Sequence, residues 1–168
     1  MTDDSKTVLT VDPKVSYIVA QVESAGFGGA MRFEPSVYEH IKGCTLPGKD
    51  VTTESTLVQH IAKINSCTIE TAELIYSMSF GLYQIMGYNL YRMGLHQPVS
   101  AFLAGVSSRA LQDSFFAQFL DEHGINFTWE EMRNDPEKLN LFSSHYNGSL
   151  AYGNRMKSVA RGHYGEVS

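Results

Sequence analysis

The stretch Ser79-Phe80-Gly81-Leu82-Tyr83-Gln84-Ile85-Met86-Gly87 combines a turn with a small polar set. Its two glycines let the backbone bend or come close to another surface. Its apolar members are expected to hold Ser79, Tyr83 and Gln84 against a core. A glutamine presented in this way can donate to and accept from a sugar hydroxyl or amide. Taken alone, the stretch is more typical of an ordinary turn between two core helices, so its flanks decide the interpretation.

Helix signals dominate those flanks. Asp12-Pro13 predicts a helix start, with Asp12 as the N-cap and Pro13 in the first helical position. Apolar residues follow at helical spacing, and glycines after Ser24 predict the end of the helix. Further helices are predicted from Pro35 to Ile41, from Glu54 to Asn65, from Thr68 to the turn at Ser79, from Ser107 or Ser108 to His123, from Thr128, from Asp135 to Gly148, and over Tyr152–Ala160, with a loop over Gly43–Thr53.

Strand-like alternation is almost absent from the chain. The exceptions are a short apolar run over Val8–Val11 and a short ribbon around Phe27–Phe33. A chain of 168 residues is long enough for one domain with a real hydrophobic core. The sequence therefore predicts a mainly α single domain over residues 1–168, with a polar lead-in over 1–11, about seven to nine helices and at most a small β-ribbon.

Composition excludes several classes of function. The net charge is −5, from 13 basic and 18 acidic residues, so neither nucleic acid nor an anionic membrane is an expected partner. No apolar run reaches the roughly 18 residues of a membrane helix, and the first residues do not have the pattern of a secretory signal. The six histidines and two cysteines lack metal-ligand spacing, so no metal or cofactor is expected; free thiols are favoured over a Cys44–Cys67 disulfide.

Glu23 stands at the carboxyl end of the first predicted helix, whose buried side is apolar. The helix dipole and apolar neighbours both disfavour an ionised carboxylate there. A general acid must hold its proton, so this setting suits Glu23 to that role. The competing interpretation is an exposed glutamate on the polar face of a frayed helix end.

Three polar elements lie at breaks between predicted helices: Glu23-Ser24, Ser79–Gln84 and Tyr146-Asn147-Gly148. Side chains at such turns can converge on one cleft. One carboxyl group with amide, hydroxyl and aromatic groups suits a polysaccharide site, because a protonated glutamate can donate to a glycosidic oxygen while the others hold the sugars.

These elements, in this order, resemble those of goose-type lysozymes and lytic transglycosylases. The closer resemblance is to the phage N-acetylmuramidase domain found in many endolysins. Its motifs are Val-Glu-Ser, an aromatic-Glu phrase matched here by Arg32-Phe33-Glu34, Gly-Leu-Phe-Gln-Ile-Met-Gly, and Tyr-Asn-Gly before a final helix. The matching text runs from about Val15 to about Arg161, which is nearly the whole chain.

The resemblance implies a lysozyme-like fold and cleavage of peptidoglycan between N-acetylmuramic acid and N-acetylglucosamine. It makes Glu23 the general acid and Glu34 a supporting residue. Two departures are evident: Pro35-Ser36 replaces the family's usual Arg-His, and Tyr83 replaces a common Phe. The substrate-contacting residues that it implies are Ser24, Glu34, Ser79, Tyr83, Gln84, Tyr146 and Asn147.

The sequence leaves the reaction outcome open. A retaining enzyme needs a nucleophile about 5 Å from the acid, and an inverting one needs a base about 6.5–9.5 Å away. Glu34, Asp50 and Glu54 are the candidates for that base. Attack by the substrate's own 6-hydroxyl would instead give the 1,6-anhydro product of a lytic transglycosylase. A non-catalytic glycan-binding or structural virion module is the remaining alternative, which the presence of Glu23 in its motif disfavours.

The expected partner is the glycan strand of bacterial peptidoglycan, and the expected state is a monomer. Without a recognisable secretory signal, the protein is expected in the host cytoplasm before its release to the periplasm or cell wall, or on a virion.

Overall fold

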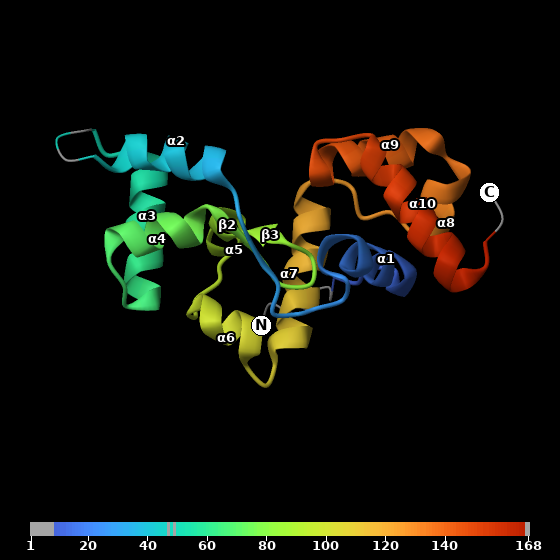
Figure 1. Ribbon diagram of the computed structural model, residues 1–168, viewed down its shortest axis with the longest axis horizontal. Coiled ribbons are helices and arrows are strands. Elements are labelled where there is room, and N and C mark those ends of the chain that lie inside the picture. The colour runs from blue at the N-terminus through green and yellow to red at the C-terminus, as the bar shows by residue number, and fades with distance from the viewer. Residues whose placement is uncertain (1–8, 47, 49, 167–168) are drawn as a thin grey trace, which may run out of the picture. The chain divides into compact units, whose positions relative to one another are not determined.

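The computed structural model describes residues 9–46, 48 and 50–166, and most of these residues are helical (Figure 1). Ten helices are present in the described part of the chain, one more than the upper end of the expected range. A small three-stranded sheet accompanies them, which confirms a mainly α fold with a minor β-component. The helices are α1 (Pro13–Ser24), α2 (Pro35–Thr45), α3 (Thr53–Asn65), α4 (Ile69–Tyr76), α5 (Gly87–Arg92), α6 (Val99–Ala104), α7 (Ser108–Glu122), α8 (Trp129–Asn134), α9 (Pro136–Asn147) and α10 (Ala151–Tyr164); the strands are β1 (Met31–Phe33), β2 (Met78–Phe80) and β3 (Ile85–Met86).

The chain forms two compact units, which are described separately below. The sheet unit covers Glu23–Gln112 and contains β1–β3 with helices α2 to α6. The helical unit combines the N-terminal residues through Val22 with those from Asp113 onward. The expectation of a single domain over the whole chain stays a prediction.

Helix α1 begins and ends where the sequence predicts. The Asp12 carboxylate accepts a hydrogen bond from the Lys14 backbone N–H at 2.8 Å, so Asp12 caps the helix start. Val15, Ile18 and Val19 are fully buried. After Ser24 the backbone turns left-handed at Ala25, with φ 51°, and at Gly26, with φ 76°, which ends the helix.

Within the sheet unit, helices α2, α3 and α4 pack together in the cyan and green part of the chain (Figure 1). Helix α2 runs four residues beyond the predicted end at Ile41, so the expected loop from Gly43 begins later. In α3 the fully buried positions are Val58 and Ile61, whereas Leu57 and Ile64 are only half-buried.

The stretch from Ser79 to Gly87 is a β-hairpin rather than a turn between helices. β2 pairs antiparallel with β3, with Phe80 opposite Ile85, and also with β1, with Arg32 opposite Ser79. The expected ribbon near Phe33 thus exists as strand β1, whose partner is β2. At Gly87 a Cβ atom would collide with the carbonyl oxygen of Ile75, so this glycine permits a close backbone approach.

In the helical unit, the predicted helix starts are confirmed. Thr128 and Glu131 form a capping box at the start of α8, and the Asp135 carboxylate caps α9. Trp129 is 1% exposed, and its indole N–H donates to the Glu166 carboxylate at 2.7 Å. Lys14 also binds Glu166, at 3.1 Å. The start of α1, the start of α8 and the segment after α10 are therefore tied together.

The remaining expectation about strands was wrong for Leu9–Val11, which form no strand. Val8, the first residue of that run, lies outside the described residues. In the part of the chain that the structure describes, no helix is both long and apolar enough to cross a membrane.

Candidate active site

Glu23 lies in the last turn of α1, and its side chain is only 5% exposed. The neighbouring Ser24 hydroxyl donates a hydrogen bond to the backbone carbonyl of Leu82 at 2.9 Å. Ser24 therefore joins the end of α1 to the hairpin loop. This hydrogen bond holds the backbone beside Glu23 in place. The competing interpretation requires an exposed glutamate at a frayed helix end, which such a contact disfavours.

The side chain of Arg32 on β1 contacts two carboxylates. Its Nη1 atom lies 3.9 Å from Oε2 of Glu23, and its Nε atom donates to Oε1 of Glu34 at 2.7 Å. Glu34 occupies the N-cap position of α2, but its side chain makes no capping hydrogen bond, because it is turned to Arg32 instead. The guanidinium of Arg32 therefore bridges the two carboxyl groups. The shorter contact shows that Glu34 is the main partner of Arg32.

The hairpin beside this group has its own polar network. The Ser79 hydroxyl donates to the side-chain oxygen of Gln84 at 2.9 Å, and the Gln84 amide donates to the carbonyl of Gly81 at 3.0 Å. Gln84 adopts φ 49°, which is unusual for a residue with a side chain. Both ends of its amide thus hold the hairpin loop in shape, so a structural role accounts for the Gln84 contacts that the structure shows.

Gln112, on α7, is the central buried amide of the sheet unit and was missed by the sequence analysis. Its Oε1 atom accepts from the backbone N–H of Leu82 at 2.7 Å, and its Nε2 atom donates to the carbonyl of Gly28 at 3.0 Å. A Cβ at Gly81, where φ is +79°, would lie 2.5 Å from that Oε1. Gln112 is thus positioned to clamp the loop after Glu23 onto the hairpin. Gln112 lies four residues before the apolar Phe116, on the same face of the helix, and this spacing could have indicated a buried amide.

The structure brings together six of the residues that the sequence analysis singled out. Glu23 and Ser24 adjoin the hairpin, Glu34 reaches them through Arg32, and the hairpin contributes the others. Ser79 and Tyr83 are buried, at 0% and 2% exposure, so they support the site from within the fold. The assignment of substrate contacts stays a prediction; the residues concerned are Ser24, Glu34, Ser79, Tyr83 and Gln84.

Tyr146 and Asn147 belong to the helical unit. The Tyr146 ring is half-buried in an aromatic cluster, stacked on Phe142 at 5.4 Å and edge-on to Phe116 and Phe119. Asn147 is the exposed last residue of α9, followed by Gly148 in a left-handed helix cap. The predicted contacts of Tyr146 and Asn147 with substrate stay predictions.

This site offers a largely buried carboxyl group, a second, half-exposed carboxylate and a cation between them. Glu23 and Glu34 contact the same guanidinium, so the distance between them is limited to two contacts plus the width of that group. This upper limit is compatible both with the about 5 Å of a retaining glycosidase pair and with the about 6.5–9.5 Å of an inverting pair. Two carboxyl groups so placed can supply a proton donor and either a nucleophile or a base for water.

Comparison with known proteins gives matches over most of the chain. The family model of the N-acetylmuramidases matches residues 51–163. The chain is 34% identical over 137 residues to an endolysin of Enterobacteria phage PRD1, which covers 80% of this chain and 86% of that protein. No solved structure matches.

These matches show a glycoside hydrolase of the muramidase class, and the mainly helical fold is consistent with a lysozyme-like domain. Within that class, the chain belongs to the N-acetylmuramidase family, whose substrate is peptidoglycan. The family match begins at residue 51, after both Glu23 and Glu34. The roles of these two residues therefore rest on the geometry of the sheet unit.

Proposed function

We propose that the protein hydrolyses the glycan strand of peptidoglycan between N-acetylmuramic acid and N-acetylglucosamine, with Glu23 as the general acid. The observation that carries this proposal is the placement of Glu23. Its side chain is 5% exposed, adjoins the hairpin through Ser24, and shares the Arg32 guanidinium with Glu34. A carboxyl group excluded from water in this way can hold a proton until a glycosidic oxygen reaches it.

Glu34 is the proposed base. Its side chain is 30% exposed, so water has access to it, and the contact with Arg32 orients it. In the proposed step Glu23 donates its proton to the leaving oxygen as the glycosidic bond breaks. Glu34 accepts a proton from the water that attacks the anomeric carbon, on the face opposite the leaving group. The product then has inverted configuration and a free reducing end.

The two other carboxylates considered from sequence have less support. Asp50 is an exposed residue in the segment before α3. Glu54 lies in the first turn of α3, where its own backbone N–H and the Thr52 side chain lower its pKa, with smaller contributions from Arg92 and His40. Neither makes an ion pair with Arg32 in the described part of the chain, whereas Glu34 does. The shared guanidinium thus supports Glu34.

The first test is mass spectrometry of purified peptidoglycan digested by the wild type and by Glu23→Gln. The wild type should release muropeptides with reducing ends. Glu23→Gln should fold normally and lose about 10²–10⁴-fold of the cleavage rate, which is the usual contribution of general acid catalysis. Glu39→Gln, which changes an exposed glutamate of α2, is the matched control. Products with 1,6-anhydro ends would instead identify a lytic transglycosylase, and wild-type cleavage by a folded Glu23→Gln protein would exclude Glu23 as the acid.

The second test concerns Glu34. Glu34→Gln should lower the cleavage rate by about 10²–10⁴-fold if it activates water, and NMR of the first wild-type product should show the inverted anomer. Arg32→Gln should have the smaller effect, because it removes orientation without removing either carboxylate. Equal, modest losses of cleavage rate in Glu34→Gln and Arg32→Gln would show that Glu34 only positions Arg32 and is not the base.

In the cell we propose the role of a phage lytic enzyme that is made in the host cytoplasm and acts on the wall after release. The likeness to the phage PRD1 endolysin over most of the chain supports this role. Expression of the chain in a host whose inner membrane is permeabilised on demand should cause lysis only after permeabilisation. Lysis without it would contradict the proposed route.

A further inference from the structure

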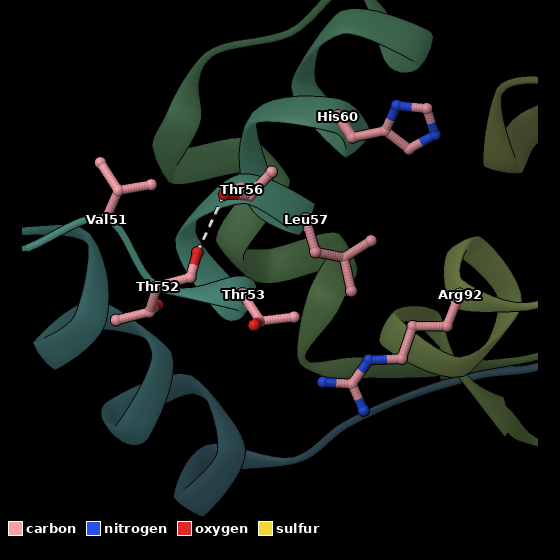
Figure 2. Close-up of a pocket in the computed structure, with 7 residues that line it drawn as sticks. All are labelled: Val51, Thr52, Thr53, Thr56, Leu57, His60 and Arg92. Atoms are coloured by element: carbon pink, nitrogen blue, oxygen red, sulfur yellow. Dashed lines mark hydrogen bonds between the residues drawn. The ribbon is translucent and has the colours of Figure 1, made fainter.

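Two hollows in the sheet unit adjoin one residue, Arg92, at the end of α5. The larger has a volume of about 590 Å³ and is formed by the start of α3 and the residue before its cap (Figure 2). The smaller has a volume of about 330 Å³ and lies among α2, α4 and α5. The larger is lined by Val51, Thr52, Thr53, Thr56, Leu57, His60 and Arg92, and the smaller by Ser36, Val37, His40, Tyr76, Tyr88 and Arg92.

Arg92 is exposed and is positioned by an aromatic ring rather than by an acid. Its guanidinium carbon lies 5.2 Å from the centre of the Tyr88 ring. Among the described residues it makes no hydrogen bond, and no carboxylate lies within ion-pair distance of it. Figure 2 shows the guanidinium extending toward Thr53 and Leu57 across the larger hollow. A guanidinium held over an aromatic ring still points its N–H donors outward in its own plane. These donors can bind a carboxylate in bidentate fashion.

The other groups in the larger hollow define what can accompany such a carboxylate. Val51 and Leu57 present aliphatic surface, and Thr53 presents a hydroxyl group. The larger hollow has no aromatic side chain on which a sugar ring could stack. A carboxylate flanked by small methyl-bearing groups fits this lining better than a sugar does. Acidic peptides that contain alanine have that chemistry, and the peptide stems of peptidoglycan are peptides of this kind.

The smaller hollow lies close to Glu34 along the chain. It is lined by Ser36 and Val37, which follow Glu34 by two and three residues. In peptidoglycan the peptide stem is attached to N-acetylmuramic acid, one of the two sugars at the bond to be cleaved. A surface that binds the stem should therefore lie near the proposed catalytic carboxyl groups, and the start of α2 follows directly after one of them.

One acidic residue opposes an anionic ligand. Arg92 and His40 contribute to the lowered pKa of Glu54, so this carboxylate feels their charge, although its own backbone N–H and Thr52 have larger effects. The larger hollow is lined by the ionisable side chains of Arg92 and His60, and the smaller by those of Arg92, His40, Tyr76 and Tyr88. Glu54 follows the lining residue Thr53 in the chain and is the acidic group that Arg92 influences. Removing the Arg92 charge and removing the Glu54 charge must then change the affinity for an anion in opposite directions.

We propose that the two hollows beside Arg92 bind the acidic peptide stem of peptidoglycan, with the Arg92 guanidinium holding a stem carboxylate. The choice of this ligand rests on the proposed function. The surface itself contains no residue proposed for catalysis, so it sets affinity for peptide-bearing wall rather than the chemistry of cleavage.

The test is a titration of the full chain with the free tripeptide L-alanyl-γ-D-glutamyl-diaminopimelate, followed by calorimetry. This peptide has no glycosidic bond, so binding is measured without cleavage. Arg92→Gln should weaken binding roughly 10- to 100-fold, the loss typical of one charge-assisted hydrogen-bonded pair. Glu54→Gln should tighten binding a few-fold. Arg155→Gln is the matched control, because Arg155 is also exposed and stacked on a tyrosine, 5.1 Å from the Tyr152 ring, and it should bind as the wild type does.

Several outcomes would overturn the proposal. Unchanged binding by Arg92→Gln would do so, as would an equal loss in Arg155→Gln, which would indicate a general effect of charge. Inorganic phosphate that binds as tightly as the tripeptide would indicate an unspecific anion site. Failure of the proposed function is distinguishable: the wild type would then leave glycan bonds intact in the mass-spectrometric assay while tripeptide binding still depended on Arg92.

Discussion

At the scale of single residues, the candidate site depends on one buried amide. Gln112 is 1% exposed and satisfies both the N–H of Leu82 and the carbonyl of Gly28. It also donates to the carbonyl of Phe102. An apolar substitute of similar size leaves these backbone groups buried without partners. Each buried backbone group left without a partner lowers the free energy of unfolding by about 1–3 kcal/mol.

We therefore expect Gln112→Leu to lower the free energy of unfolding by at least about 1–3 kcal/mol, as measured by urea denaturation. Gln118→Leu is the control, because Gln118 lies on the same helix and its amide donates to the exposed Glu122 side chain at 2.8 Å. That control should change stability by less than about 0.5 kcal/mol. Equal stability of Gln112→Leu and the wild type would show that the amide does not clamp the hairpin.

Sequence patterns predicted where a residue lies in the fold when the pattern is local, whereas the substrate contacts of these residues stay predictions. Glu23 and Ser24 follow from a helix end, and Gln84 follows from a glycine-flanked turn; both lie where these signals place them. Gln112 gains its role from partners far along the chain, and nothing in its own sequence neighbourhood identifies those partners. For Gln112 the separation from Gly28 is 84 residues.

At the scale of secondary-structure elements, helix α8 shows how a capping box responds to pH. The Lys138 ammonium, the backbone N–H of Thr128 and the Thr128 hydroxyl lower the pKa of Glu131 from 4.5 to about 2. A carboxyl group whose pKa is lowered by folding stabilises the folded state above its ordinary pKa. That stabilisation is lost as the pH falls from about 4.5 to about 2, because the proton then binds the folded state as well.

Glu131→Gln should accordingly have a lower melting temperature than the wild type at pH 7. The difference between the two proteins should shrink below pH 4.5 and vanish near pH 2. Scanning calorimetry of both proteins across this range measures it, with Glu39→Gln as a control for loss of one exposed negative charge. A difference that stays constant down to pH 2 would show that the Glu131 charge is not what stabilises α8.

Element types were more predictable than the small sheet. Asp-Pro and Thr-x-x-Glu patterns identified three helix starts, because a cap needs only a few neighbouring residues. Strands β2 and β3 have three and two residues, too few to show an alternating pattern. β1 is stabilised by pairing with residues 47 positions away, so the sequence showed a ribbon near Phe33 without its partner.

At the scale of the whole molecule, residues near both ends of the described chain meet in the helical unit. Glu166 accepts hydrogen bonds from the Trp129 indole at 2.7 Å and from Lys14 at 3.1 Å. Asp12 accepts the backbone N–H of Trp129 at 2.9 Å. The contacts of Lys14 and Asp12 join segments more than a hundred residues apart. Sequence patterns alone predicted the helices that carry them but not their convergence.

Glu166 should therefore stabilise the helical unit more than its position near the chain end suggests. Its own side chain is 13% exposed, and its pKa is lowered chiefly by the Trp129 hydrogen bond, so it is ionised at neutral pH. Glu166→Ala leaves the buried indole N–H without its acceptor, and we expect a loss of about 1–3 kcal/mol in the free energy of unfolding. Glu166→Gln keeps an acceptor for the indole but loses the charge that attracts Lys14, so it should fall between Glu166→Ala and the wild type. Urea denaturation monitored by Trp129 fluorescence measures all three, since the chain has a single tryptophan. If Glu166→Ala were as stable as the wild type, the contacts of Glu166 with Trp129 and Lys14 would not stabilise the helical unit.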